Sequence, residues 1–158
     1  MTPAGRAIEA NMALVRRYML EILNGRRLDE LGEIAATDYL DHAALPGQGP
    51  GQAGLRHRID LLVQALDPRW TILDLVADPT VVVVRWVLHG VHRGALLGLP
   101  PTGRVIALAG IDMYRVRDAR FAEHWNVVDL SPLVVEGGGD DGLAEALPSG
   151  GLELDISG

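Results

Sequence analysis

The sequence contains no cysteine, and all 14 of its basic residues are arginine because lysine is absent as well. The lack of cysteine excludes disulfides, thiolate nucleophiles and cysteine-ligated metal or iron–sulfur centres. No apolar run approaches the length of a membrane span, and residues 1–9 lack the apolar segment of a secretory signal. We therefore expect a cytoplasmic protein that does not bind membranes.

Motifs for the common cofactors are also missing. The five histidines show neither an i, i+4 helical spacing nor a His-x-Glu pattern, so no metal site is predicted. The glycine-rich residues 47–51 lack the Lys-Ser/Thr pair of a phosphate-binding loop, and neither a nucleophile elbow nor a dinucleotide fingerprint occurs. Any catalysis is therefore expected to be proton transfer in an apolar cavity, without a cofactor.

Charge is distributed unevenly along the 158 residues. The net charge of -7 argues against a nucleic-acid partner, which needs a basic surface. Residues 136–158 hold six acidic residues and no arginine, whereas residues 1–135 are almost neutral. We expect one pocket-bearing domain over residues 1–135 and an acidic, glycine-rich, flexible extension over residues 136–158.

The N-terminal half of the chain predicts three helices. Apolar residues from Ile8 to Ile22 recur every three or four positions, which predicts a helix over residues 6–23. Similar stripes predict helices over residues 28–35 and 55–66. The intervening residues 38–51, which include a Pro/Gly-rich stretch, are expected to form a loop.

From Trp70 onward the pattern is typical of strands. Apolar and β-branched residues predict strands over residues 70–77, 81–91, 105–116 and 121–128. The run 81–91 is so continuously apolar that we expect it to be covered on both faces. Three helices followed by about four antiparallel strands predict an α+β domain with its helices on one face of a sheet.

A series of short segments stands in a characteristic order and spacing. They are Val15-Arg16-Arg17-Tyr18 with Asn24, Asp38-Tyr39-Leu40-Asp41-His42, Gly90-Val91-His92-Arg93-Gly94, Gly98-Leu99-Pro100-Pro101-Thr102-Gly103-Arg104, Gly110-Ile111-Asp112, Tyr114-Arg115, and Glu123-His124-Trp125-Asn126-Val127-Val128-Asp129. Together they resemble the SnoaL-like polyketide cyclase family of the nuclear transport factor 2-like superfold, over roughly residues 10–135.

This resemblance implies a cone-shaped, curved antiparallel sheet around a deep pocket that three N-terminal helices close. It also implies a homodimer through the outer face of the sheet and an apolar, polyketide-like small molecule as substrate. Aldol cyclases of this family have an acid/base aspartate at the place of Asn126 and a histidine at the place of Asp112. The catalytic carboxylate is therefore either moved to the neighbouring strand or absent.

The register of the last hairpin decides which residues share the pocket face. A three-residue loop at residues 117–119 would place Asp112 directly opposite His124, with Asn126 on the same face. A two-residue loop would place Asp112 opposite Trp125 instead. We favour the first register, because similar hairpins in this family commonly use it.

In that register Asp112 and His124 form an acid/base unit. Asp112 is the predicted general base and His124 its assistant, while His92 and Asn126 are predicted to donate hydrogen bonds to the enolate. The alternative is a buried Asp–His pair that only ties two strands together.

Further residues are expected at the pocket. Tyr18 is a candidate donor to a developing oxyanion, as a tyrosine is in ketosteroid isomerase. Tyr39 and His42 are expected at the pocket mouth, and Trp86 is expected to pack in the wall. Asp129 is expected either to accept a hydrogen bond at the pocket bottom or to cap the strand end.

The leading hypothesis is a cofactor-independent cyclase, or a related lyase or isomerase, acting on a polyketide-like intermediate. A second is an epoxide-opening enzyme that would assemble Asp112 and Asp129 with Arg85 or Arg93. A steroid-isomerase-like enzyme and a non-catalytic small-molecule-binding dimer are further alternatives, because a fold alone does not determine chemistry.

Overall fold

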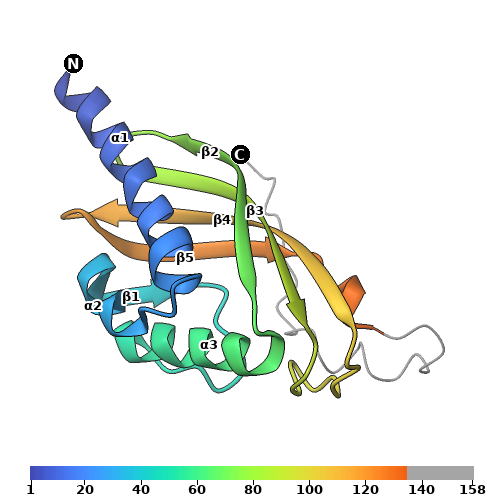
Figure 1. Ribbon diagram of the computed structural model, residues 1–158. Coiled ribbons are helices and arrows are strands. Elements are labelled where there is room, and N and C mark those ends of the chain that lie inside the picture. Colours follow the sequence, from blue (N-terminus) through green and yellow to red (C-terminus); the bar gives the residue numbers. More distant parts are fainter. Residues whose placement is uncertain (135–158) are drawn as a thin grey trace, which may run out of the picture.

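The computed structural model describes residues 1–134, which form an α+β domain around one curved sheet (Figure 1). The predicted extension over residues 136–158 lies outside the described residues. The strands of the sheet lie in the order β1-β5-β4-β3-β2. In chain order the elements are α1 (Pro3–Arg16) with a π-helical continuation (Arg17–Leu23), a 3-10 turn (Leu28–Glu30), α2 (Leu31–Ile34), β1 (Ala35–Asp41), α3 (Gly51–Leu66), β2 (Arg69–Ala77), β3 (Val81–Val91), β4 (Val105–Arg117), β5 (Arg120–Val128) and a 3-10 turn (Ser131–Leu133).

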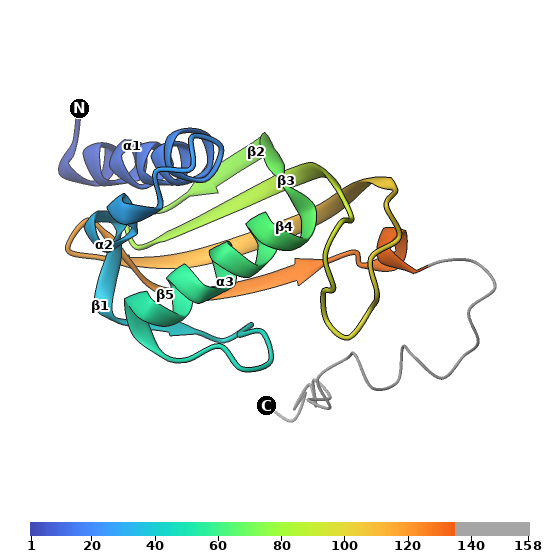
Figure 2. The ribbon, with the colours of Figure 1, turned by 60° about the horizontal axis from the view of Figure 1, so that its bottom comes forward.

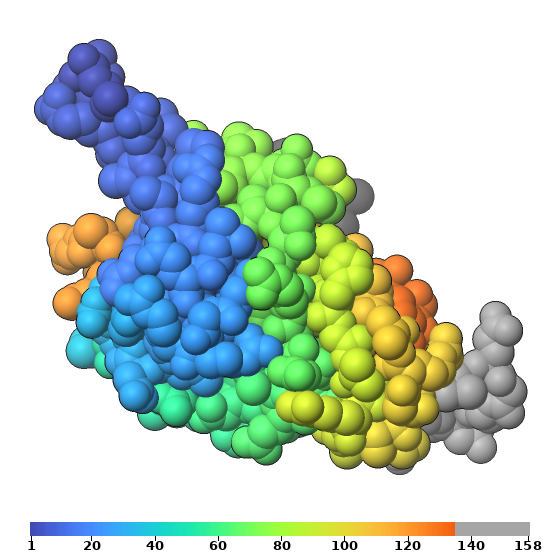
Figure 3. All heavy atoms as spheres, in the orientation of Figure 1, coloured from blue at the N-terminus to red at the C-terminus, as the bar shows by residue number. Residues whose placement is uncertain are grey.

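The helices lie on one side of the sheet, as expected. Figure 2 shows α1 and α3 on the same side, with α3 running along the concave face. The N-terminal end of α1 projects beyond the body of the domain (Figure 3). Within residues 1–134, no helix is long and apolar enough to cross a membrane.

The predicted strand β3 is confirmed, but it is not covered on both faces. Val82, Val84, Trp86 and Leu88 are buried towards the helices, whereas the alternate residues are half-buried or exposed. The outer face of the sheet carries exposed apolar side chains, including Val105 and Val127 of β4 and β5, each at least three-quarters exposed. A homodimer through this face stays a prediction.

The segment expected to be a loop after the second helix is strand β1. It pairs in parallel with β5, with Leu40 opposite Glu123 and Asp41 opposite His124. The sequence prediction was wrong here because seven residues with little β-branched character give no local strand signal. The pairing comes from a partner more than 80 residues away, and it directs Tyr39 and Asp41 towards the interior.

The β4–β5 hairpin has neither of the two predicted registers. Its turn is the two-residue Asp118–Ala119, both with positive φ, so Arg117 pairs with Arg120. This matches the φ > 0 pair of a type I′ hairpin turn. A bulge between Arg115 and Val116 in the ladder then shifts the pairing by one residue.

Because of this bulge, the side chains predicted to share one face of the hairpin still do so, although their pairing differs from the predicted one. Asp112 lies opposite Asn126, and His124 lies opposite Tyr114, so Asp112 and His124 are diagonal neighbours and not a direct pair. Both still face the concave side and are buried. The prediction of a shared face is therefore confirmed, although the register on which it rested is wrong.

Candidate active site

A cavity of about 590 Å³ lies between the concave face of the sheet and the helices. Most of its wall is apolar, from Leu, Ile, Val and Trp side chains. The predicted site residues that line it are Tyr18, Tyr39, His42, Trp86, Asp112, His124 and Asn126. Seven of the nine predicted residues therefore meet at one cavity.

A buried imidazole between two carboxylates forms the polar centre of this cavity. His124 Nδ1 donates to Asp41 Oδ1 over 2.9 Å, and His124 Nε2 faces Asp112 Oδ1 at 3.6 Å. All three side chains are less than a tenth exposed. The expected Asp–His pair is present, but it is one half of an Asp41–His124–Asp112 arrangement.

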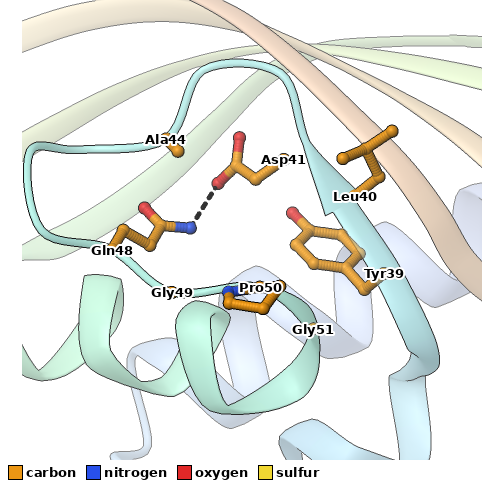
Figure 4. Close-up of a pocket in the computed structure, with 8 residues that line it drawn as sticks. All are labelled: Tyr39, Leu40, Asp41, Ala44, Gln48, Gly49, Pro50 and Gly51. Carbon is orange, nitrogen blue, oxygen red and sulfur yellow. Dashed lines mark hydrogen bonds between the residues drawn. The ribbon is translucent and has the colours of Figure 1, made fainter.

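Asp41 is held by more donors than any other carboxylate at the cavity. Its Oδ1 accepts from His124 and from the Ala43 backbone N–H, and its Oδ2 accepts from Gln48 Nε2 over 2.9 Å. Figure 4 shows Tyr39 and Asp41 projecting from the end of β1 towards the segment that carries Gln48. A smaller pocket of about 210 Å³ lies between the end of β1 and this segment.

Asp112 has fewer partners. Its Oδ2 accepts from the Tyr114 hydroxyl over 3.0 Å, while its Oδ1 has no hydrogen-bond partner within residues 1–134. The facing His124 Nε2 likewise lacks one there. Two buried polar atoms that face each other beyond hydrogen-bond distance are costly unless a bound molecule or a small movement satisfies them.

The two carboxylates control the charge of the imidazole. Burial lowers the pKa of His124, but the close contact with Asp112, the hydrogen bond to Asp41 and the negative charges of both carboxylates outweigh burial, so its pKa is raised above the ordinary value. Burial raises the pKa of Asp41, yet the hydrogen bond and charge of His124, with Arg58 and Gln48, bring its pKa well below the usual range. Asp41 is therefore an anion near neutral pH, and His124 is biased towards the imidazolium.

An aromatic wall surrounds this centre. The Tyr114 ring stacks on His124 with centroids 4.8 Å apart, and Tyr18 meets Tyr114 edge-on at 6.1 Å. Burial, reinforced by the negative charge of Asp112, raises the pKa of Tyr18 and Tyr114. Burial followed by the neighbouring Tyr18 raises the pKa of Tyr39 well above its usual value. These hydroxyls remain protonated and are available as donors.

Trp86 forms part of the cavity wall and is 5% exposed. Its indole lies where a side chain at Gly110 of the neighbouring strand would have to sit, so Gly110 is what makes room for it. Its Nε1 has no hydrogen-bond partner among residues 1–134. The prediction that Trp86 packs in the wall agrees with this placement.

The cavity mouth is bounded by residues 42–46, which follow β1. The His42 ring stacks on Trp125 at 4.4 Å between centroids, and its Nε2 contacts Glu123 at 3.1 Å. His42 is about one-third exposed, so it sits at the mouth, as expected, and not beside Asp112.

Two predicted site residues do not line the cavity. His92 was expected to face the pocket, but the end of α3 packs on Gly90 two residues earlier, and His92 lies against the following loop with Nδ1 3.3 Å from Thr102 Oγ1. Asp129 accepts from the Ser131 backbone N–H and begins the last 3-10 turn, which matches the strand-end alternative.

Sequence reasoning missed two residues at the site, Asp41 and Arg58. Arg58 extends from α3 into the cavity wall, where its Nη1 donates to the Ala43 carbonyl over 2.7 Å and contacts Asp41 Oδ2 at 3.4 Å. The sequence does contain a sign that Arg58 is buried. It falls three residues after Leu55 and four before Leu62, within the apolar stripe of its helix.

These features define a class of protein: a cone-shaped α+β domain with a small-molecule-sized, mainly apolar cavity and a buried acid–base pair on its wall. Residues 13–136 match the SnoaL-like polyketide cyclase family. The chain belongs to this family, and its fold is nuclear transport factor 2-like.

Solved structures agree with this assignment. TsrD from Streptomyces laurentii is 26% identical, with a TM-score of 0.71 over 79% of this chain and 92% of that one. IdmH from Streptomyces antibioticus, described as a putative polyketide cyclase, is 27% identical, with a TM-score of 0.66 over 77% of this chain and 94% of that one. A comparison with curated protein sequences gives no significant match.

Proposed function

We propose that this protein is a cofactor-independent cyclase that closes a ring in a polyketide-like intermediate by general acid–base catalysis. The observation that carries the proposal is the buried contact between Asp112 Oδ1 and His124 Nε2, 3.6 Å apart at the wall of a largely apolar cavity. Membership of a cyclase family supports the reaction class. The chemistry follows from which atoms of this pair hold a proton.

His124 holds a proton on Nδ1, because that nitrogen donates to the ionised Asp41. If Nε2 carried no proton, its lone pair would face the Asp112 carboxylate and the two atoms would repel. The raised pKa of His124 indicates the imidazolium instead. The Asp112 carboxyl group then lies beside a cation, at the wall of a mainly apolar cavity.

The reaction requires three steps that return every proton. The Asp112 carboxylate removes a proton from a carbon next to a substrate carbonyl, and the electrons of that C–H bond form an enolate. The enolate carbon then attacks a second carbonyl of the same molecule and forms the new C–C bond. The resulting alkoxide takes a proton back from Asp112, or takes one from His124, to which Asp112 then passes its own proton, so substrate and product have the same mass.

Two lining residues would stabilise the enolate oxygen in this reaction. Asn126 lies directly opposite Asp112 on β5, and its amide is a donor that no change of pH removes. The Tyr18 hydroxyl remains a donor because burial raises its pKa. His92 has no part in this mechanism, because it does not line the cavity.

The test is turnover of a linear poly-β-ketone methyl ester, with the cyclised isomer of equal mass separated by chromatography. Asp112→Asn should lower the rate by about 100-fold or more, which is the usual range for losing a general base. Asp129→Asn is the matched control, because Asp129 caps a turn outside the cavity, and it should react like the parent protein. Unchanged turnover by Asp112→Asn would refute the assignment.

Epoxide opening is a second candidate, in a changed form. The predicted set fails because Arg85 pairs with Asp74 and Arg93 with Asp67, both on the surface, and Asp129 lies outside the cavity.

Arg58 and Asp112, however, line the same cavity, and Asp41, which lines the smaller pocket, contacts Arg58 Nη1 at 3.4 Å. Turnover in heavy-oxygen water separates the two reactions, because hydrolysis of an epoxide incorporates the label and ring closure does not.

A further inference from the structure

Arg58 is a buried cation whose hydrogen-bonding capacity is only partly used. Its side chain is 11% exposed, and a guanidinium carries five N–H donors. Only Nη1 makes hydrogen bonds within residues 1–134: one of 2.7 Å to the Ala43 carbonyl and one of 3.4 Å to Asp41 Oδ2. The second is longer than a usual N–H···O bond, so Arg58 is anchored chiefly by a backbone carbonyl.

The other edge of the guanidinium, formed by Nε and Nη2, is left open. Neither nitrogen bonds to residues 1–134, and neither is among the buried polar atoms sealed from solvent without a partner. Because Arg58 lines the 590 Å³ cavity, the open edge is accessible from it. A charged acceptor in the cavity would bind this edge more strongly than water does, because hydrogen bonds between two ionised groups are the strong ones.

The neighbouring carboxylates do not fill that role. Asp41 already accepts from His124, Gln48 and the Ala43 N–H, and its contact with Arg58 uses Nη1. Asp112 faces His124 and accepts from Tyr114. His124 is the cationic partner of both carboxylates. The Nε–Nη2 edge of Arg58 therefore has no anionic partner among residues 1–134.

We propose that the Nε–Nη2 edge of Arg58 is a carboxylate-binding subsite, so that the substrate of the proposed reaction is a polyketide-like carboxylic acid. A guanidinium edge presents two parallel N–H groups that match the two oxygens of a carboxylate. The inference rests on the proposed function for its substrate class. In this arrangement the acid group of the substrate binds at α3, beside Arg58, and the reacting ketone lies beside Asp112 and His124.

The test uses 3-hydroxy-2-naphthoic acid and its methyl ester as a matched pair of unreactive probes, with binding followed by fluorescence at neutral pH. The acid should bind the parent protein about tenfold more tightly than the ester, because a charge-assisted hydrogen-bond pair supplies at least that factor. In Arg58→Gln the ratio should fall to about one, while the ester still binds. Arg56→Gln is the matched control on the same helix, since Arg56 pairs with Asp29 and Asp60 on the surface, and it should keep the preference.

Two further measurements keep the result decisive if Arg58→Gln does not fold. Arg58→Lys keeps the charge but loses the paired donors, so the acid preference should fall several-fold. In the nitrogen-15-labelled parent protein, the Arg58 Nε–H resonance should move when the acid is added and stay when the ester is added. No binding of the acid, no preference for it, or a preference that survives loss of the guanidinium would overturn the proposal.

The same binding experiment in Asp112→Asn separates this inference from the proposed function. If that variant keeps the acid preference but has normal turnover, the carboxylate subsite stands and the catalytic assignment fails. If Asp112→Asn loses turnover and the parent protein shows no acid preference, the catalytic assignment stands and the subsite is wrong.

Discussion

The two carboxylates on either side of His124 lie in contrasting surroundings. Asp41 accepts from a ring nitrogen, a backbone N–H, an amide and a guanidinium, at the junction of β1 and the following loop. Asp112, in the middle of β4, accepts one hydroxyl and keeps one oxygen unpartnered among the described residues. A carboxylate saturated with donors is a weak base that fixes its neighbour, whereas an under-coordinated one retains the capacity to take a proton.

This contrast assigns different tasks to two chemically identical groups. Asp41 orients the imidazole through its hydrogen bond to Nδ1, and in the proposed mechanism Asp112 is the group that acts on the substrate. The arrangement is comparable in logic to catalytic triads, in which a buried aspartate holds the histidine tautomer while another group reacts. Variants of Asp41, Asp112 and Gln48 change one side of the imidazole, and a variant of His124 removes the imidazole itself.

The largest effect on stability is expected from Asp41→Asn. Removing one partner of a buried ion pair leaves His124 and Arg58 uncompensated, and typically costs about 3 kcal/mol in the free energy of unfolding. Asp74→Asn is the matched control, because it breaks an exposed pair with Arg85 and should cost about 1 kcal/mol or less. Urea unfolding of both variants tests this, and equal losses would contradict the structural role of Asp41.

A second prediction concerns the pH dependence of stability. The raised pKa of His124 means that its contribution is complete below the unfolded value of about 6.5 and is lost as the pH rises through the folded value. The lowered pKa of Asp41 means that its contribution is present above about pH 3.9 and is lost as the pH falls through the folded value. The combined stabilisation should therefore be greatest between about pH 4 and 6.5.

Urea unfolding across this range measures the effect directly. In His124→Gln the decline in unfolding free energy above pH 6.5 should disappear, because the titrating group is gone. His57→Gln is the control, since His57 is exposed on α3, and it should keep the decline. A parent protein that becomes more stable on passing from pH 6 to 8 would contradict the assigned sign of the His124 shift.

The smallest effect is expected from Gln48→Ala. It removes one of several donors to Asp41 and the contact that ties residues 45–48 to β1, so the loss should be about 1 kcal/mol. Thermal unfolding measures the cost. A loss as large as that of Asp41→Asn would show that the loop, and not the imidazole, is what Asp41 chiefly stabilises.

Most of the fold could be predicted from local sequence. Residues 55–66 of α3 and strands β2 to β5 follow from apolar periodicity, which depends on neighbours in the chain. Strand β1 could not be predicted in this way, because its partner β5 is remote in sequence and its own residues carry no strand signal. The bulge in the β4–β5 hairpin could not be predicted either, since no glycine near Arg115 and Val116 marks its position.

The site was predicted in part for the same reason. Strand alternation places His124 and Asn126 on one face, and the register of the same hairpin brings Asp112 to that face. Asp41 joins them only through the parallel pairing of β1, and Arg58 only through the packing of α3 across the sheet. Counting alternate residues from Trp86 and Leu88 places His92 on the same face as these two side chains. His92 nevertheless lies beyond the point where the end of α3 packs on Gly90, and strand alternation cannot reveal where a helix packs.

The division of labour between the two carboxylates can be measured most directly by carbon–deuterium exchange. In heavy water, the parent protein should accelerate exchange of the C1 protons of 2-tetralone, a benzo-fused cyclic ketone. Asp112→Asn should lose this acceleration by about 100-fold or more while remaining folded. Exchange at the parental rate in Asp112→Asn would contradict the assignment of Asp112 as the group that removes the proton.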